Sequence, residues 1–307
     1  MTTAEFFLDA GQSAVKIRSV AGTQRRTLSF SRVDTSKAIA PQIVFAIHQF
    51  VEQTGTRPWR IAVSSTALSD PHRTVEEMMR GVRDLGAQSI LVAHDSVGGF
   101  LGALGHDHGA VAAVGTGVVT LGVGPQGFAR VDGWGNIIGD AGSGYWIGRK
   151  ALDHALRAYD GRGPETVLLS IMRDHFEDVE TAYLELQADP DRIFRVASFA
   201  KPTTEAAATD AVARVIVEQA CTEIIVAVEA ALRRVGFSRS DTPAVSWTGS
   251  VAANPLVSSL LERLLHEAWP GAVVHAPHGE PLDGVEKMVS LPSDHPLVHQ
   301  VVTVYAS

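Results

Sequence analysis

The stretch GAVAAVGTGVVTLGVG, residues 109–124, places a Gly-Thr-Gly turn between two short apolar segments. β-Branched residues follow the second glycine directly, and they favour a strand. A dinucleotide-binding glycine motif needs a helix at this point, so the pattern predicts a β-hairpin. Because glycine lacks a Cβ, the turn lets backbone N–H groups approach an anion, and the Thr116 hydroxyl adds a donor. A plain hairpin turn is the alternative interpretation.

This hairpin opens the second of two similar halves. Residues 1–107 predict the order β-β-β-α-β-α-β-α, and a similar order restarts at residue 108. Each half begins with a β-turn-β whose turn combines glycine with a hydroxyl group. We therefore predict an α/β protein built from a duplicated βββαβαβ unit, with domains at 1–107 and 108–307 and a ligand site in the cleft between them. The C-terminal residues are expected to be helical, and the sequence leaves open whether the last helix packs on the first domain.

Composition excludes several classes of function. The 307 residues carry a net charge of −8, which argues against a nucleic-acid partner. The N-terminus lacks the basic region of a signal peptide, and no apolar run is long enough to cross a membrane. We expect a cytoplasmic protein. Its single cysteine, Cys221, lies in a predicted helix and is interpreted as a buried apolar residue.

Three aspartates stand where chemistry can use them. Asp9 ends an apolar strand beside the first turn, where its carboxylate could orient Mg²⁺ through water. Asp95 ends another strand. It could act as a general base for a hydroxyl that attacks a phosphoryl group, or it could cap the helix that follows. Asp140 is not needed as a helix cap, because Ser143 is the expected cap of the helix that follows. With Trp134 it is typical of a sugar site, in which carboxylates accept hydroxyl hydrogen bonds and aromatic rings cover the sugar.

Five segments together resemble a known family: DAGQSAVKI, AHDSVGGFLGAL, AAVGTGVVTLGV, DGWGNIIGDAGSGYWIGRKAL and VSWTGSVAANPL. They resemble the BadF/BadG-type ATPases and N-acetylglucosamine kinases of the actin-like, hexokinase-like superfamily. The resemblance covers most of the chain, and the block around Trp134 and Asp140 is its most specific part. It implies two ribonuclease H-like (actin/hexokinase-like) domains.

The resemblance also implies ligands and roles. The chain is expected to be an ATP-dependent, Mg²⁺-requiring kinase of an amino sugar, N-acetylglucosamine or glucosamine, with Asp95 as catalytic base. The family forms dimers, so a homodimer is a further implication. The binding residues implied are Asp9, Gly11, Gln12 and Ser13 (first phosphate motif, with Asp9 reaching Mg²⁺ through water), Gly115, Thr116 and Gly117 (second phosphate motif), Gly133, Trp134, Gly135 and Asp140 (sugar, with Asp95), and Gly249 and Ser250 (adenosine).

The sequence departs from the family pattern at two positions, and these differences leave other functions possible. The lysine usual in the first turn is Ala14 here, although Lys16 would lie on the same face of an extended strand and could replace it. A family glutamate beside the sugar block is Ala141. These changes allow a non-catalytic sugar or nucleotide sensor. An ATPase activator is the other alternative, but its iron–sulfur cluster would need cysteines beyond Cys221.

Overall fold

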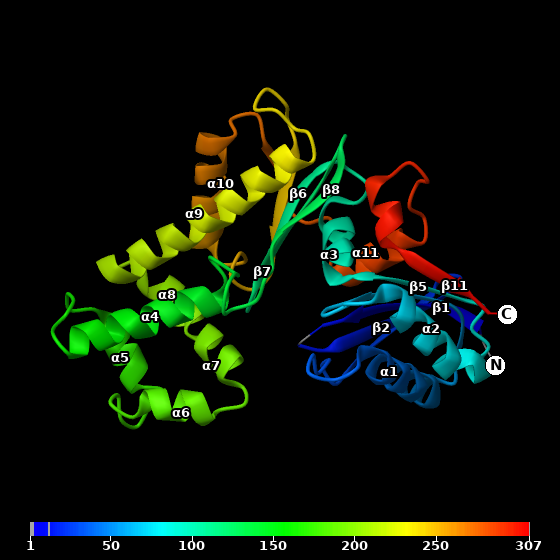
Figure 1. The fold of residues 1–307 in the computed structure, drawn as a ribbon, viewed down its shortest axis with the longest axis horizontal. Helices are drawn as coiled ribbons and strands as arrows, with labels where there is room; N and C mark the ends of the chain where they lie inside the picture. Colours follow the sequence, from blue (N-terminus) through cyan, green and yellow to red (C-terminus); the bar gives the residue numbers. More distant parts are fainter. Residues whose placement is uncertain (1–2, 12, 307) are drawn as a thin grey trace. The chain divides into compact units, whose positions relative to one another are not determined.

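The computed structural model describes residues 3–11 and 13–306, which form two compact units (Figure 1). The first unit consists of residues 1–107 and 276–307, and the second of residues 108–275. The C-terminal segment thus belongs to the first unit, whereas the expected second domain extended to residue 307. It packs there because α11 (Pro281–Met288) lies on α3 (Asp95–Leu104), and because β11 (Val302–Tyr305) pairs with β5 (Ser89–His94). The expected helical end is wrong for 302–305, where β-branched residues alternate in a strand.

The first unit is a six-stranded mixed sheet with helices on both faces. Its order is β11-β5-β4-β1-β2-β3, in which β1, β4 and β5 run parallel and the other pairings are antiparallel. The helices α1 and α2 contact β2 and β5, and α3 and α11 contact β4. Phe6, Ile17 and Phe50 are fully buried in the core beneath α1 and α2. The remaining elements are β1 (Thr3–Ala10), β2 (Val15–Ala21), β3 (Gln24–Phe30), α1 (Ile39–Thr54), β4 (Arg57–Ser65), α2 (Pro71–Val82), η1 (Arg83–Leu85) and η2 (Pro296–Gln300).

The second unit has a five-stranded sheet in the order β10-β9-β6-β7-β8. The hairpin predicted at the Gly-Thr-Gly turn is confirmed, because β6 and β7 pair antiparallel on either side of it. Like β3-β2-β1-β4-β5 in the first unit, the order places three antiparallel strands beside two parallel ones. Its elements are β6 (Gly109–Val114), β7 (Val118–Gly124), β8 (Gly127–Asp132), α4 (Gly144–Tyr159), α5 (Val167–Arg173), α6 (Ala182–Ala188), α7 (Arg192–Ser198), α8 (Ala200–Ala206), α9 (Ala211–Arg234), β9 (Ala244–Thr248), α10 (Pro255–Ala268) and β10 (Val273–Val274).

Helix α9 packs on β6, β7 and β8 and supplies much of the core of this unit. The sequence predicts one helix from residue 204 to 235, but the chain breaks it at Asp210. That side chain caps α9 by accepting a hydrogen bond from the Ala213 N–H at 2.8 Å, and it also accepts one from Val167 N–H at 2.9 Å. None of the helices in residues 3–11 and 13–306 combines the length and apolar composition needed to cross a bilayer.

The contact between α3 and α11 depends on glycine, which gives a first prediction. A Cβ on Gly284 of α11 would lie 1.9 Å from the Gly98 carbonyl oxygen of α3. Gly284→Ala should therefore separate the helices and lower the free energy of unfolding by about 1–3 kcal/mol, measured by urea denaturation. Gly99→Ala is the matched control, because a Cβ there meets no atom within 4 Å. It should stabilise α3 by about 0.5–1 kcal/mol, and equal stability of the two variants would contradict the packing argument.

Candidate active site

The turn at residues 115–117 is held by helix α4. The N–H groups of Gly144 and Tyr145 donate to the carbonyl oxygens of Gly115 and Thr116, at 2.8 and 3.0 Å. As expected, Ser143 caps the helix, its hydroxyl accepting from Trp146 N–H at 3.2 Å. Within the described residues, the N–H groups of Thr116 and Gly117 have no hydrogen-bond partner. The turn therefore offers two backbone donors and one hydroxyl to a ligand.

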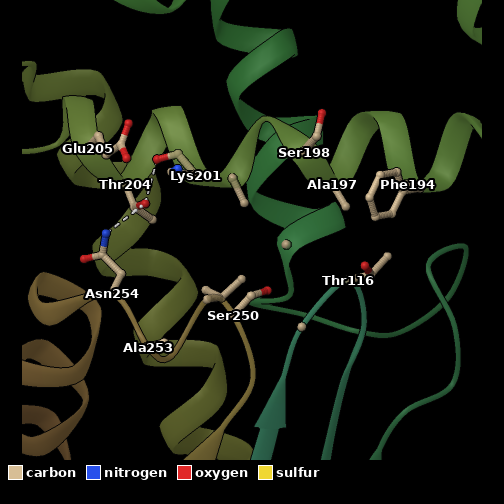
Figure 2. Close-up of a pocket in the computed structure, with 14 residues that line it drawn as sticks. Thr116, Phe194, Ala197, Ser198, Lys201, Thr204, Glu205, Ser250, Ala253 and Asn254 are labelled. Atoms are coloured by element: carbon tan, nitrogen blue, oxygen red, sulfur yellow. Dashed lines mark hydrogen bonds between the residues drawn. The ribbon is translucent and has the colours of Figure 1, made fainter. Parts of the chain in front are cut away.

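A cavity of about 380 Å³ lies directly against this turn (Figure 2). Gly115 and Thr116 form part of its wall, together with Ser250. Gly249 lies beside the cavity with φ +97°, and a Cβ there would be 2.3 Å from the Val114 carbonyl oxygen. Only glycine allows the two turns to approach so closely. The structure thus brings together residues that the sequence assigned to phosphate and to adenosine.

The opposite wall comes from α7 and α8, which the sequence analysis missed. Figure 2 shows Phe194 and Lys201 on these helices, across from Thr116 and Ser250. Thr204 joins the walls, since its Oγ1 accepts a hydrogen bond from Asn254 Nδ2 at 3.2 Å. These helices are short and carry no recognisable motif, so the sequence did not indicate that they form a cavity wall. Asn254 was predictable only as the cap of α10, a role that it also fills. The other lining residues are Gly144, Ala197, Ser198, Ala200, Glu205, Val251 and Ala253.

Asp132 closes the loop that carries the expected sugar residues. Its Oδ1 accepts a hydrogen bond from Asp140 N–H at 2.9 Å, and its Oδ2 accepts one from Ala141 N–H at 3.1 Å. Both Asp132 and Asp140 have φ near +58°, a conformation that aspartate tolerates better than most residues. The clamp brings Gly133, Trp134, Gly135 and Asp140 together on one loop. Asp132 was not among the residues expected from the sequence.

Asp140 lies between this loop and the Gly-Thr-Gly turn. Its Oδ1 accepts from Gly135 N–H at 3.1 Å, and its Oδ2 would lie 2.6 Å from a Cβ on Gly117. Burial raises the pKa of Asp140, with the nearby Asp132 charge adding to it, while the Gly135 hydrogen bond and Arg130 oppose the shift. Trp134 is 62% exposed, with the Arg130 guanidinium 5.0 Å from its ring centroid. A carboxylate is thus held against the turn, and an exposed aromatic ring lies on the same loop.

In the first unit, Asp9 belongs to a polar row across the sheet. It is the register partner of Lys16 on β2 and of Ser64 on β4, and the Ser64 hydroxyl donates to Asp9 Oδ1 at 3.2 Å. Burial raises the pKa of Asp9 to about 6; the Ser64 hydrogen bond and Lys16 oppose the shift, and the charges of Asp95 and Glu280 add to it. Lys16 Nζ lies 3.1 Å from Glu280 Oε2.

The rest of the first turn follows β1. The N–H of Gly11 donates to the Ala14 carbonyl oxygen at 3.0 Å, and the Gly11 carbonyl oxygen accepts from Val33 N–H. Ser13 is exposed. Gln12, which was expected to contact phosphate, lies outside the described residues.

Asp95 is the first residue of α3 and does not cap it, because His94 occupies the cap position. His94 Nδ1 lies 2.7 Å from Asp95 Oδ1 and 3.3 Å from Ser96 N. Burial raises the pKa of Asp95, but the hydrogen bond and charge of His94, with Ser96 N–H and the Thr66 hydroxyl, outweigh it and leave the pKa below its usual value.

The Asp132 clamp gives a second prediction. Asp132→Gly keeps the backbone conformation accessible and removes both acceptors, so the amides of Asp140 and Ala141 should exchange with solvent at least about tenfold faster. Asp132→Asn retains one acceptor oxygen and should give a smaller change. Hydrogen exchange followed by mass spectrometry or NMR measures both. Unchanged protection in Asp132→Gly would contradict a role for Asp132 in holding the loop.

Comparison with known proteins finds sugar kinases among the relatives of this chain. The chain resembles N-acetyl-D-glucosamine kinase of Dictyostelium discoideum, with 27% identity over 179 residues, 56% of each chain. It is 40% identical over 95 residues to N-acetylmuramic acid/N-acetylglucosamine kinase of Clostridium acetobutylicum, 31% of this chain and 30% of that one. The matched segments thus span about half and about a third of those relatives.

The fold is shared with solved structures. A protein of Chromobacterium violaceum proposed to be an N-acetylglucosamine kinase superposes with a TM-score of 0.72 at 21% identity, covering 92% of this chain and 98% of that one. The model of the BadF/BadG/BcrA/BcrD ATPase family matches residues 15–285. This match spans most of both units, and the chain therefore belongs to the BadF/BadG/BcrA/BcrD ATPase family.

Proposed function

We infer that the protein is an ATP-dependent kinase that transfers the γ-phosphoryl group of ATP to a hydroxyl of an amino sugar, N-acetylglucosamine or a close relative. One observation carries this inference: Asp140 lies against Gly117, so a carboxylate suited to sugar hydroxyls directly adjoins a turn suited to phosphates. The cavity beside that turn has space for a nucleotide. The kinases named among the relatives point to the same substrate class.

In this proposal the backbone donors of Thr116 and Gly117 hold phosphate oxygens, and the cavity between Ser250 and α8 holds the nucleoside. Trp134 covers an apolar sugar face while Asp140 accepts hydroxyl hydrogen bonds. Asp95 takes the proton of the attacking hydroxyl as its oxygen bonds to phosphorus and the bond to the ADP oxygen breaks. Because the pKa of Asp95 is below its usual value, the carboxylate is ionised and ready to accept at neutral pH.

Asp9 is the residue suited to a magnesium ion. No group of three or more His, Cys, Asp or Glu side chains in residues 3–11 and 13–306 could hold a metal by itself. This fits Mg²⁺, which is usually bound by one or two carboxylates together with substrate phosphates and water. The raised pKa of Asp9, beside the negative charges of Asp95 and Glu280, also marks a place that favours added positive charge. When bound, Mg²⁺ would neutralise charge on the phosphates.

The alternative of an ATPase activator finds no support. Cys221 is fully buried in α9, and burial raises the pKa of its thiol to about 12, so it does not offer a thiolate to a shared cluster. A non-catalytic sensor would bind the same ligands without turnover, so kinetics must separate it from a kinase. A cytoplasmic location, where ATP is available, and a homodimer remain parts of the proposal.

The decisive test measures sugar-dependent ADP release with ATP and Mg²⁺ for N-acetylglucosamine, glucosamine, N-acetylmuramic acid and glucose. At least one amino sugar should be turned over. Asp95→Asn should lower kcat by about 10²–10⁴ and leave sugar and nucleotide dissociation constants nearly unchanged, because the amide keeps the shape but accepts no proton. Asp84→Asn, an exposed aspartate of the same unit, is the control. Binding without turnover in the wild type would favour the sensor.

Asp9 gives a further prediction on stability. Its pKa is about 6 in the folded chain against 3.8 for the free side chain, so folding favours the protonated form. The stability that it contributes is therefore complete below about pH 4 and is lost as the pH rises through 6. Asp9→Asn should be more stable than wild type by about 1–3 kcal/mol at pH 7.5, and by much less at pH 4, in urea denaturation. It should also lose Mg²⁺-dependent activity. Equal stability differences at both pH values would contradict this account.

A further inference from the structure

A second cavity of the second unit serves none of the roles assigned above. It has a volume of about 470 Å³ and lies among α4, α6 and α7. This volume falls in the range of ordinary small-molecule sites, about 300–1,000 Å³. Its wall divides into an apolar part, made by Tyr145, Leu152, Leu186 and Val196, and a polar part, made by Arg149, Gln187 and Arg192.

The polar part carries two positive charges that the chain does not neutralise. Within the described residues, neither Arg149 nor Arg192 forms an ion pair, and the Arg192 guanidinium reaches only the Asp189 carbonyl oxygen at 3.4 Å. Their neighbour Arg195 differs, because it pairs with Glu185 at 2.9 Å and with Asp189 at 3.6 Å. On a chain of net charge −8, two unpaired guanidinium groups around one cavity are suited to an oxyanion.

The apolar part determines what carries that anion. Leu152 and Val196 are 8% and 7% exposed, and Tyr145 and Leu186 are half-buried beside them. Inorganic phosphate alone would leave the apolar part of the wall exposed to water. A ligand with an apolar or aromatic body would cover it, which is favourable by about 25 cal/mol for each Å² removed from water.

We propose that this cavity is a binding site for a small organic anion, a phosphate or carboxylate on an apolar body, and that its occupancy changes nucleotide affinity. The second part follows from the walls that the two cavities share. On α7, Phe194, Ala197 and Ser198 line the cavity at the Gly-Thr-Gly turn, while Arg192 and Val196 line this one. Helix α4 likewise gives Gly144 to the first cavity and Arg149 to the second.

The two shared helices are in direct backbone contact. A Cβ on Gly148 of α4 would lie 1.9 Å from the Val196 carbonyl oxygen of α7, so α7 cannot move toward α4 without displacing it. A ligand that displaces α7 from one side therefore changes the wall of the nucleotide cavity on the other. By linkage, the nucleotide must change the affinity of that ligand by the same factor.

The binding test uses phenyl phosphate and benzoate as probes, with inorganic phosphate and benzyl alcohol as partial ligands, in calorimetric titrations. At least one probe should bind with one site per chain and at least about tenfold more tightly than either partial ligand. Arg149→Gln and Arg192→Gln should each weaken it at least about fivefold. Lys150→Gln is the matched control, because it removes one charge from α4 at a side chain that stacks on Trp146. It should leave the affinity within about twofold.

Several outcomes would overturn the proposal. Equal binding of neutral and anionic probes, wild-type affinity in both arginine variants, or no binding of either probe would each remove the anion site. Circular dichroism checks that the variants are folded, as expected for substitutions of exposed side chains.

The coupling is tested with ADP. Saturating probe should change the ADP dissociation constant at least about threefold in wild type, and Arg149→Gln should need at least about fivefold more probe for the same change; an unchanged constant in wild type would overturn the regulatory part. The anion site does not rest on the proposed function, whereas the coupling does. If ADP fails to bind at all while the probe binds, the proposed kinase is wrong and the cavity assignment stands.

Discussion

Two hydrogen bonds from the first turn of α4 to the carbonyl oxygens of Gly115 and Thr116 fix the geometry on which the candidate site depends. The first amides of a helix commonly bind anions, but here they are occupied by the turn. The N–H groups of Thr116 and Gly117 remain as the backbone donors that we propose for phosphate. Because the same contacts fix Gly144 at the cavity wall, one short turn positions the helix, the cavity and the adjoining Asp140 carboxylate together.

Neighbouring groups give two aspartates of the first unit opposite properties. Asp95 has His94 Nδ1 2.7 Å from its Oδ1, and this neighbour helps to hold the pKa of the carboxyl below its usual value, which suits the base that we propose. Asp9 has a hydroxyl, one lysine that Glu280 shares, and two negative charges that disfavour its ionisation. Burial and these charges raise its pKa to about 6, so a nearby cation would favour its ionised form. In the proposed kinase, Asp95 would thus be the base, and Asp9 would be a carboxylate whose charge a bound Mg²⁺ would stabilise, at the expense of stability in its absence.

Features that depend on a few neighbouring residues could be predicted from the sequence. The hairpin at residues 115–117 follows from β-branched residues after glycine, and the Ser143 cap follows from its place before an apolar helical face. The strand 302–305 was mistaken for helix because four residues show little periodicity and its pairing partner β5 is distant in sequence. The α7–α8 wall was missed since its side chains become a cavity wall only through packing. Asp132 was missed because the two N–H groups that donate to its carboxylate lie eight and nine residues ahead in the chain.

The geometry also clarifies why Ala141 is compatible with a sugar site. Replacing the family's glutamate removes one carboxylate, but Asp132 brings another to the same backbone position, where its Oδ2 accepts from Ala141 N–H. Both oxygens of Asp132 are used by amides, and Asp140 Oδ1 is used by Gly135. This leaves Asp140 Oδ2, beside Gly117, as the acceptor best placed for a sugar hydroxyl. The loop thus depends on Asp132 for its shape, while Asp140 keeps a free oxygen for the sugar that we propose, so a change at position 141 need not disturb either carboxylate.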